Sequence, residues 1–372
     1  MTPRAAFFVP SLRGGGAERV TVLLAAAVAA RGVTADLVLA QAVGPYLATV
    51  PEGVRVVDLA ARRVVAALPA LTRYLRRERP EVLMATLANA NVVAALARRR
   101  SGVPMRLVLR EGSPIRQMAG RSGRLRGLVM PTFVRRFYPL ADLLLANAQS
   151  IADELAQELG GEGPPIRVLA NPIEPERLRA AAAALDAADL PVGSGPLFVA
   201  AGRLTEQKDF PTLLEALALL RRRGMSARLV ILGEGPDRRL LEALVERRGL
   251  GGAVRLPGFR DALPAFLARA QGFVLPSRWE GQPNVLLEAL ALGCSPVATD
   301  CPGASAEILA GGRFGRLVPM EDPERLATAM AETVERPFDA ADLAARAEEF
   351  SVARLLPRYL GALGLGGGEA GP

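Results

Sequence analysis

Two glutamates, Glu280 and Glu288, bracket a predicted helix start in the second half of the chain. Asn284 is a typical N-cap residue, and the apolar run Val285–Leu292 behind it predicts a short buried helix that ends at Gly293. The free N–H groups at such a helix start favour a phosphate. Glu288 lies one turn deeper, where its carboxylate could accept two hydrogen bonds from a ribose diol. An ordinary capped helix with two unrelated glutamates is the alternative.

Two basic residues, Arg203 and Lys208, could neutralise the negative charge of a departing diphosphate. They flank a loop directly after the predicted strand Leu197–Ala201. Metal-dependent sites that stabilise a departing diphosphate usually hold the metal with an Asp-x-Asp pair, and the sequence contains no such pair. Fixed cations at a strand end, together with a helix start, could stabilise the same charge without a metal. The alternative interpretation is a pair of surface cations.

The composition excludes several kinds of catalysis, because the 372 residues include no histidine. Ser-His-Asp and Cys-His nucleophile systems, histidine-ligated metals and histidine bases are therefore ruled out. The only cysteines are Cys294 and Cys301, and we expect them to be reduced structural residues. Of the 46 basic residues, Lys208 is the only lysine.

Apolar strand-like runs alternate with helical patterns along the whole chain. The predicted strands of the first half are Ala5–Val9, Leu37–Ala40, Val54–Asp58, Val82–Ala85, Arg106–Leu109 and Leu143–Ala146, with helices such as Ala17–Arg31 and Val65–Arg77 between them. Those of the second half are Leu197–Ala201, Arg228–Leu232, Val254–Leu256, Gly272–Leu275 and Ser295–Thr299, with helices Pro211–Arg223, Asp237–Arg248, Leu263–Arg269, Val285–Leu292 and Glu324–Glu335. This rhythm predicts an α/β protein with two Rossmann-like domains, whose ligands bind at the carboxyl ends of the strands.

The changeover between the two sets of strands defines the expected domains. We expect an N-terminal domain over residues 1–175, a linker over 176–196 and a C-terminal domain over 197–349. A further amphipathic helix over 350–366 and a flexible tail over 367–372 complete the chain. No apolar run approaches the roughly 18 residues of a membrane span and no signal peptide is evident, so we expect a cytoplasmic protein.

Five motifs in the expected order give the chain a family resemblance. They are G-G-G-A-E-R-V (Gly14–Val20), G-R-L-T-E-Q-K-D-F (Gly202–Phe210), L-G-E-G-P (Leu232–Pro236), L-P-G-F (Leu256–Phe259) and E-G-Q-P-N-V-L-L-E-A (Glu280–Ala289). With these motifs the sequence resembles the retaining glycosyltransferases of family four, which have the GT-B fold. The resemblance implies two domains facing each other across a cleft, with the C-terminal helix crossing back to the first domain.

The resemblance also implies roles for individual residues. Arg203 and Lys208 would stabilise the diphosphate, Glu280 would contact the donor sugar, and Glu288 would bind the ribose hydroxyls. The residues expected to touch phosphate or sugar through the backbone are Gln282, Pro283, Asn284 and Val285, and those expected near the nucleobase are Gly233, Glu234, Phe259 and Arg260. Gly15 and Gly16 would line the cleft between donor and acceptor. Glu307 is as easily structural as functional.

Two features of the first half fit other interpretations as well. The run Gly14–Gly16 lacks the spacing of a dinucleotide fingerprint, so it is either a ligand-binding turn or a flexible one. Arg110 and Glu111 follow the strand Arg106–Leu109, where many relatives carry a histidine near the reacting sugar. We expect Arg110 to contact substrate, and a surface Arg–Glu pair is the alternative.

The positive charge is concentrated in the first half of the chain. Residues 1–175 contain 23 basic and 13 acidic residues, whereas residues 176–372 contain 23 basic and 25 acidic ones. Residues 112–141 contain six arginines, several large apolar residues and no acidic residue. The basic first half suggests an anionic membrane surface or a phosphorylated acceptor as a partner, and a solvated basic helix is the alternative for residues 112–141. The first half lacks the interleaved aromatic residues of a nucleic-acid module, so nucleic acid is not expected.

The sequence thus predicts a metal-independent retaining glycosyltransferase without a cofactor. It would move a hexose or N-acetylhexosamine from a nucleotide-diphosphate sugar, with UDP or GDP as the nucleotide, to a lipid-linked or polysaccharide acceptor. We expect it on the inner face of the cytoplasmic membrane as a peripheral protein. An NAD(P)-dependent oxidoreductase and a non-catalytic membrane-associated nucleotide or glycan binder are the alternatives.

Overall fold

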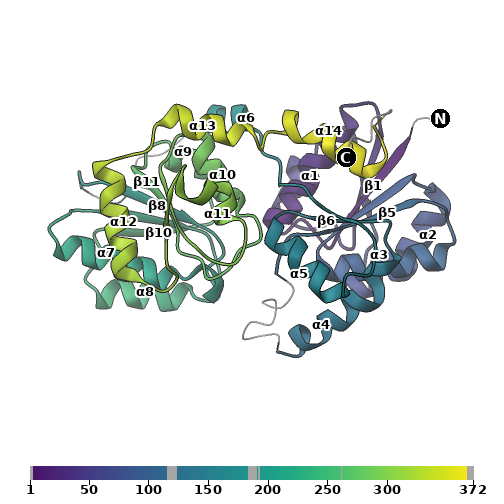
Figure 1. The fold of residues 1–372 in the computed structure, drawn as a ribbon, viewed down its shortest axis with the longest axis horizontal. Coiled ribbons are helices and arrows are strands. Elements are labelled where there is room, and N and C mark those ends of the chain that lie inside the picture. The colour runs from purple at the N-terminus through teal and green to yellow at the C-terminus, as the bar shows by residue number, and fades with distance from the viewer. Residues whose placement is uncertain (1–2, 115–123, 183–190, 192, 261, 367–372) are drawn as a thin grey trace. The chain divides into compact units, whose positions relative to one another are not determined.

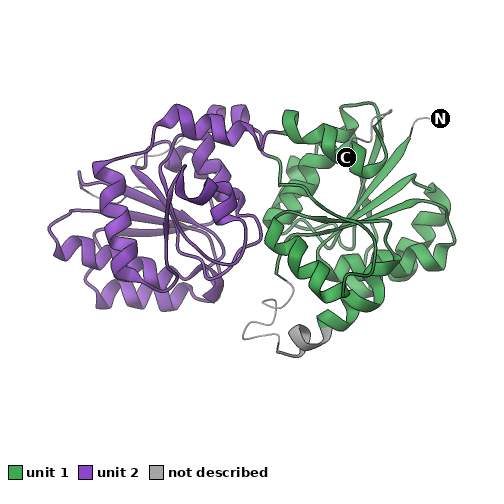
Figure 2. Ribbon diagram, in the orientation of Figure 1, with its two compact units in different colours: residues 1–172, 352–372 green, residues 173–351 purple. Residues whose placement is uncertain are grey.

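The chain folds into two compact units, each built on its own parallel sheet (Figures 1 and 2). The computed structural model describes residues 3–114, 124–182, 191, 193–260 and 262–366, and for residues 124–129 only the backbone. Unit 1 comprises residues 1–172 and 352–372, and unit 2 comprises residues 173–351. The predicted tail over 367–372 and part of the predicted linker lie outside the described residues.

Unit 1 contains a seven-stranded sheet in the order β3-β2-β1-β4-β5-β6-β7. Its strands are β1 (Arg4–Val9), β2 (Thr34–Leu39), β3 (Val54–Asp58), β4 (Val82–Thr86), β5 (Arg106–Glu111), β6 (Leu143–Ala146) and β7 (Ile166–Val168). Its α-helices are α1 (Gly16–Ala29), α2 (Leu68–Glu78), α3 (Ala88–Ser101), α4 (Arg124–Phe137), α5 (Gln149–Leu159) and α14 (Val352–Leu363). Every strand pair of this sheet is parallel.

The central strands of unit 1 are buried on both faces, which explains their continuous apolar sequences. Consecutive residues of a strand point to opposite faces of the sheet, and all five residues of β4 are buried. Phe7 and Phe8 are likewise neighbours on β1, and both have no exposed surface. The edge strand β3 differs, because Val54 is its only buried residue.

Unit 2 contains a six-stranded sheet in the order β10-β9-β8-β11-β12-β13. Its strands are β8 (Leu197–Ala201), β9 (Arg228–Leu232), β10 (Val254–Gly258), β11 (Gly272–Leu275), β12 (Pro296–Thr299) and β13 (Arg316–Val318). Its α-helices are α6 (Pro175–Ala181), α7 (Phe210–Arg222), α8 (Arg238–Arg247), α9 (Leu263–Leu267), α10 (Asn284–Ala291), α11 (Ser305–Ile308), α12 (Pro323–Glu335) and α13 (Ala340–Glu348). Phe198 on β8 and Phe210 on α7 belong to one apolar cluster of this unit.

Helix α14 lies at the end of the described chain and is nevertheless part of unit 1. Its buried face includes Tyr359, whose hydroxyl donates hydrogen bonds to the carbonyls of Leu169 at 3.2 Å and Ala170 at 3.0 Å. Arg106 on β5 donates from Nε to the carbonyl of Ala362 at 2.9 Å. These contacts attach the helix to the sheet of unit 1.

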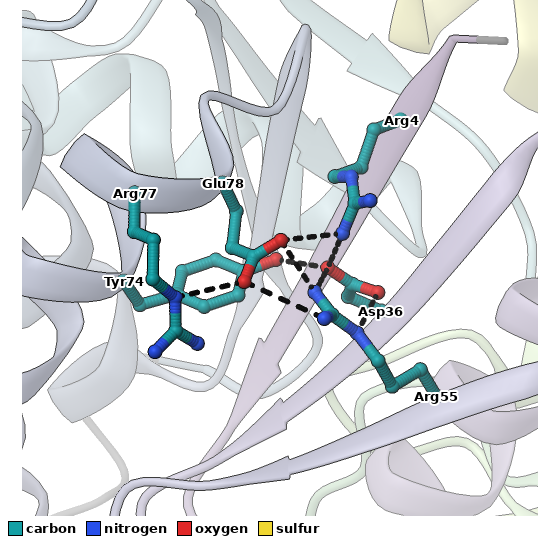
Figure 3. Close-up of polar contacts among 6 residues, drawn as sticks. All are labelled: Arg4, Asp36, Arg55, Tyr74, Arg77 and Glu78. Atoms are coloured by element: carbon teal, nitrogen blue, oxygen red, sulfur yellow. Dashed lines mark hydrogen bonds and ion pairs between the residues drawn. The ribbon is translucent and has the colours of Figure 1, made fainter.

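An ionic cluster joins three strands and helix α2 in unit 1 (Figure 3). The fully buried carboxylate of Asp36 on β2 accepts hydrogen bonds from Arg4 Nη1 at 3.0 Å, Arg55 Nη2 at 2.6 Å and the Tyr74 hydroxyl at 2.6 Å. Glu78 accepts from Arg4 Nη1 at 2.8 Å and lies 2.9 Å from Arg55 Nη2. Burial alone would raise the pKa of Asp36, but these hydrogen bonds lower it below its ordinary value.

The structure confirms the predicted α/β class with two parallel sheets, and it corrects several details. Residues 175–181 form helix α6 of unit 2, where the sequence predicts a linker, because Pro175 opens the helix and Leu178 is buried. The observed division falls between residues 172 and 173. The three-residue strands β7 and β13 were not predicted. No helix within the described ranges combines the length and apolarity needed to cross a membrane.

Candidate functional site

The loops at the carboxyl ends of the unit 2 strands carry the predicted donor-binding residues. Arg203 and Lys208 follow β8, Gly233 and Glu234 follow β9, Phe259 and Arg260 follow β10, and Glu280 with Gln282, Pro283, Asn284 and Val285 follows β11. Because all these strands are parallel, their carboxyl ends lie along one edge of the sheet. β8 and β11 are neighbours in this sheet, so their loops meet directly.

Lys208 and Glu280 form a nearly buried ion pair at this edge. Lys208 Nζ lies 2.5 Å from Glu280 Oε1, and the two side chains are 12% and 7% exposed. The Ser277 hydroxyl donates to the same carboxylate oxygen at 2.6 Å. The Thr299 hydroxyl at the end of β12 donates to the Ser277 carbonyl at 2.5 Å. Three neighbouring strand ends therefore fix the position of the Glu280 carboxylate.

Two reciprocal hydrogen bonds connect the β8 and β11 loops. The backbone N–H of Arg278 donates to the Gln207 carbonyl at 2.8 Å. Gln207 Nε2 donates in return to the Trp279 carbonyl at 2.9 Å. Lys208 and Glu280 are the next residues on the two segments, so the ion pair continues this connection.

The Arg278 side chain joins three of these loops by ion pairs. Its guanidinium lies 3.6 Å from Glu206, 3.5 Å from Asp209 and 2.8 Å from Glu321, measured between the nearest nitrogen and oxygen atoms. Asp209 and Glu321 both have positive φ angles, 44° and 56°, which are strained for residues with a side chain. Arg278 thus forms ion pairs with the side chains of two residues whose backbone is strained.

Two glycines allow the loops to approach one another closely. A Cβ atom on Gly233 would lie 1.9 Å from the Gly202 carbonyl oxygen, and a Cβ atom on Gly303 would lie 2.4 Å from that of Glu280. Their φ angles are +139° and +137°, which also favour glycine. A side chain at either position would push a site loop out of place.

Helix α10 begins one residue earlier than the sequence predicts. Pro283 is the N-cap and Asn284 is the first helical residue, which corrects the expected cap at Asn284. The extended conformation of Pro283 carries the chain into the helix, as φ −74° and ψ 100° show. Gly293 has the expected left-handed conformation, with φ +67°. Glu288 lies on this helix and is 1% exposed, so its carboxyl group is inside unit 2.

Gln282 is buried, with 7% of its surface exposed, whereas the predicted residues of the β9 and β10 loops lie near the surface. Glu234 accepts a hydrogen bond from Arg238 Nη1 at 2.8 Å, and its carbonyl accepts from the Leu204 N–H at 3.0 Å, which links the β9 and β8 loops. Phe259 is 46% exposed at the end of β10. Arg203 is exposed, and no contact among the described residues places its side chain at the Lys208–Glu280 pair. The structure therefore brings Lys208 and Glu280 together and leaves Arg203 on the surface of its loop.

The glycine loop of unit 1 has an internal partner that the sequence analysis missed. The Glu18 carboxylate accepts hydrogen bonds from the backbone N–H groups of Gly14 at 2.8 Å and Gly15 at 3.0 Å. The Ser11 hydroxyl donates to its other oxygen at 3.4 Å. Glu18 thus occupies the amides of Gly14 and Gly15, and the expected ligand contacts of Gly15 and Gly16 stay predictions. The spacing of three residues from Gly15 to Glu18, a capping-box pattern, could have revealed this.

Arg110 and Glu111 are not a surface pair, since each is only 1% exposed. As neighbours on β5, their side chains point to opposite faces of the sheet. Arg110 Nη2 donates to Asn171 Oδ1. Glu111 accepts from the Tyr138 hydroxyl at 2.8 Å, and burial raises the pKa of Glu111 to about 7.

The side chains of the described residues include no group of three or more Cys, Asp or Glu residues arranged to hold a metal ion. Both cysteines, Cys294 and Cys301, are buried free thiols. Burial raises the pKa of Cys294 to about 12 and that of Cys301 to about 11. Neither thiol is therefore a nucleophile at neutral pH.

Two parallel β-sheets in separate α/β units, with polar loops at the carboxyl ends of their strands, are the architecture of a GT-B protein. Residues 14–177 match the family described as "Glycosyltransferase Family 4", and residues 195–336 match "Glycosyl transferases group 1". A lipopolysaccharide core biosynthesis glycosyltransferase, LpsE of Rhizobium meliloti, is 30% identical over 87% of this chain and 86% of its own length. The chain belongs to glycosyltransferase family 4, and it is a glycosyltransferase.

Two further proteins resemble the chain. An N-acetylgalactosaminyltransferase of Campylobacter jejuni, named for a diacetylbacillosaminyl-diphospho-undecaprenol substrate, is 30% identical over 63% of this chain and 62% of its own length. The crystal structure of HepE of Anabaena in complex with UDP has a TM-score of 0.75 at 20% identity. The structural match covers 97% of this chain and 99% of the HepE chain, and it confirms the predicted fold.

Proposed function

We propose that this glycosyltransferase retains the configuration of the sugar it transfers, and that it takes a hexose or N-acetylhexosamine from a nucleotide-diphosphate sugar without a metal or cofactor. The observation that carries the proposal is the Lys208–Glu280 pair, held at the carboxyl edge of the unit 2 sheet beside the start of helix α10. Lys208 and Arg203 would stabilise the diphosphate, and Glu280 would contact the donor sugar. Glu288 would bind the ribose.

The remaining donor contacts follow from the loop positions. The backbone from Gln282 to Val285 leads into helix α10, whose N-terminus favours an anionic phosphate. The residues expected near the nucleobase directly follow β9 and β10; they are Gly233, Glu234, Phe259 and Arg260. The exposed ring of Phe259 would lie against the nucleobase. UDP is the first candidate nucleotide because the solved relative HepE binds it.

The transfer would proceed on one face of the sugar. The bond from the anomeric carbon to the leaving phosphate oxygen breaks, and the acceptor oxygen bonds to that carbon from the same side. The acceptor hydroxyl passes its proton to the departing phosphate, so no enzymic base is required. Lys208 stabilises the negative charge on the leaving diphosphate, which is where a fixed cation gains most in the transition state.

A lipid-linked or glycan acceptor is the finer part of the proposal. Two relatives support it, since one is named for an undecaprenol diphosphate substrate and the other for lipopolysaccharide core biosynthesis. Such acceptors are made at membranes, and helix α4 offers a surface for contact with anionic lipid. Phe133 is 39% exposed and stacks on Phe137 at 5.7 Å, and Arg135 and Arg136 are exposed beside them. The chain would thus be peripheral at the cytoplasmic face of the membrane.

A ligand panel tests the proposal. Thermal unfolding of the full chain is measured with UDP, GDP, ADP and NAD, each with and without EDTA. UDP or GDP at about 100 times its Kd should stabilise by roughly 2.7 kcal/mol, and EDTA should not change this. Stabilisation by NAD alone would indicate an oxidoreductase. Nucleotide binding without release of UDP or GDP from any nucleotide sugar would indicate a non-catalytic binder.

A further inference from the structure

Polar side chains gather at the carboxyl ends of four neighbouring strands in unit 1. Thr86 ends β4, Arg110 is the last but one residue of β5, Asn147 follows β6 and Asn171 follows β7. All four are buried, with exposures of 1%, 1%, 5% and 2%. Buried polar groups are unusual at a strand end unless they serve a ligand or one another.

Several of these side chains have atoms without a hydrogen-bond partner in the part of the chain that the structure describes. They include Arg110 Nε and Nη1, Thr86 Oγ1 and Asn147 Oδ1. The remaining guanidinium nitrogen, Arg110 Nη2, donates to Asn171 Oδ1. Two donors of a buried cation and two acceptor oxygens are thus unpaired at the carboxyl ends of three neighbouring strands, β4, β5 and β6. Most buried polar atoms in proteins have partners, so this concentration calls for a function.

Among the described residues, no hydrogen bond or ion pair joins Arg110 to the adjacent carboxylate of Glu111, although the charge of Arg110 does act to lower the pKa of Glu111. Thr86 and Arg110 are register partners of β4 and β5, so their side chains leave the sheet on one face, whereas Glu111 leaves on the other. The Glu111 carboxylate accepts hydrogen bonds from the Tyr138 hydroxyl at 2.8 Å and from the Gly112 N–H at 3.2 Å. Burial raises the pKa of Glu111 to about 7, so near neutrality the carboxyl is only partly ionised. A buried cation without a counterion is strongly unfavourable.

Backbone strain lies at the same edge of the sheet. Leu87 follows Thr86 directly and has φ +82° and ψ 135°, a conformation that residues with a side chain rarely adopt. Strain of this kind persists where the surrounding structure enforces it, and it concentrates at binding sites. The strained turn and the unpaired atoms thus point independently to a ligand.

We propose that Arg110 binds an anionic group of the acceptor, a phosphate or a carboxylate, in a subsite completed by Thr86, Asn147 and Asn171. Arg110 Nε and Nη1 would donate charge-assisted hydrogen bonds to the anion. Thr86 Oγ1 and Asn147 Oδ1 would accept hydrogen bonds from hydroxyls beside it. The inference rests on the proposed function and adds that the acceptor is charged. The anion is either the phosphate of a lipid-linked acceptor or the carboxylate of an acidic sugar.

The test compares Arg110→Met with Arg167→Met, which removes an exposed arginine from β7 of the same sheet. Thermal unfolding of the full chain is measured at constant ionic strength with saturating UDP, which fills the donor site. Methyl phosphate and glucuronate are the two probes. At least one probe should stabilise the wild-type chain and Arg167→Met. Its affinity for Arg110→Met should fall about 10- to 100-fold, the range for a lost hydrogen bond to a charged group.

The outcomes separate the two ligand sources and the two proposals. A response to methyl phosphate alone indicates a phosphorylated acceptor, and a response to glucuronate alone indicates an acidic sugar. Equal responses of wild type and Arg110→Met, or no response to either probe, would overturn the inference, while UDP stabilisation would still support the donor site. Without a probe, Arg110→Met should melt no lower than wild type, because it removes a buried charge that forms no ion pair with the described residues. Should it not fold, Arg110→Gln replaces it, because glutamine keeps polar atoms but no charge, and unchanged probe affinity in that variant also overturns the inference.

Discussion

The Lys208–Glu280 pair allows stability and catalysis to be tested in one experiment. Lys208→Met removes the cation and leaves the Glu280 carboxylate in a site that is 7% exposed. Breaking a buried pair in this way costs about 3–5 kcal/mol. Glu280 keeps the Ser277 hydroxyl at 2.6 Å, so we expect the lower end of this range, about 3 kcal/mol. For a unit of this size that corresponds to a melting temperature lower by about 6–12 °C.

The double variant Lys208→Met/Glu280→Gln should recover most of that stability. It removes both charges, and replacing a whole buried ion pair by uncharged groups often changes the stability very little. Ser277 can still donate a hydrogen bond to the glutamine carbonyl. Transfer should not recover, because the cation proposed to stabilise the leaving diphosphate is still absent, and we expect a loss of about 10²–10³ in rate.

Urea unfolding of unit 2 and release of free nucleotide diphosphate in the presence of acceptor measure the two effects separately. Arg203→Met is the matched control, because Arg203 is exposed and its loss should lower transfer without lowering stability by more than about 0.5 kcal/mol. Equal stability of the single and double variants would show that the pair is not a buried ion pair in solution. Normal transfer by Lys208→Met would refute its proposed role.

Three further predictions concern other parts of the molecule. Glu288→Gln should weaken binding of free UDP or GDP in calorimetry, whereas Glu280→Gln should weaken only the nucleotide sugar, and equal losses of free-nucleotide affinity would contradict this division. The pKa of Asp36 is lowered in the folded state, so its stabilisation is present above its ordinary pKa and is lost as pH falls through the folded value. The free energy of unfolding of unit 1, measured with urea, should therefore fall in wild type below about pH 4. Asp36→Asn should lower this free energy by about 2–3 kcal/mol at pH 7 and show little further loss in acid. The same loss in acid for both proteins would exclude Asp36 as its source. Arg135→Gln/Arg136→Gln should sediment less with anionic vesicles at low salt, each arginine adding about 1 kcal/mol, and equal sedimentation with neutral vesicles would count against a lipid surface.

The strands could be predicted from the sequence where burial on both faces produces an uninterrupted apolar run. Leu143–Ala146, Leu197–Ala201, Arg228–Leu232 and Gly272–Leu275 are such strands and have the predicted bounds. The edge strand Val54–Asp58 also has its predicted bounds, although Val54 is its only buried residue. β7 and β13 have three residues each, include an arginine and leave most of their residues partly or fully exposed, so their sequences carry no such signal. Helix α6 was missed because its Pro175 suggests a turn as readily as a helix start.

The candidate site was predictable in its residue types but not in its connections. Lys208 and Glu280 are 72 residues apart, and they meet because β8 pairs with β11, an order that local sequence does not specify. The bridging role of Arg278 depends on the same order. The burial of Arg110 depends on Asn171, which reaches it from beyond β7. Such contacts between distant segments follow from sheet topology rather than from motifs.

The place of helix α14 in unit 1 has a consequence for synthesis on the ribosome. Unit 1 begins at the start of the chain but needs residues from 352 onward, so all of unit 2 is made before unit 1 can close. Until then the surface that α14 covers, including the carbonyls bound by Tyr359, is open to other partners. Unit 2 is continuous from residue 173 to residue 351 and can fold first as it emerges. The unit with the proposed donor site would thus be complete on the nascent chain before the unit that carries the proposed acceptor subsite.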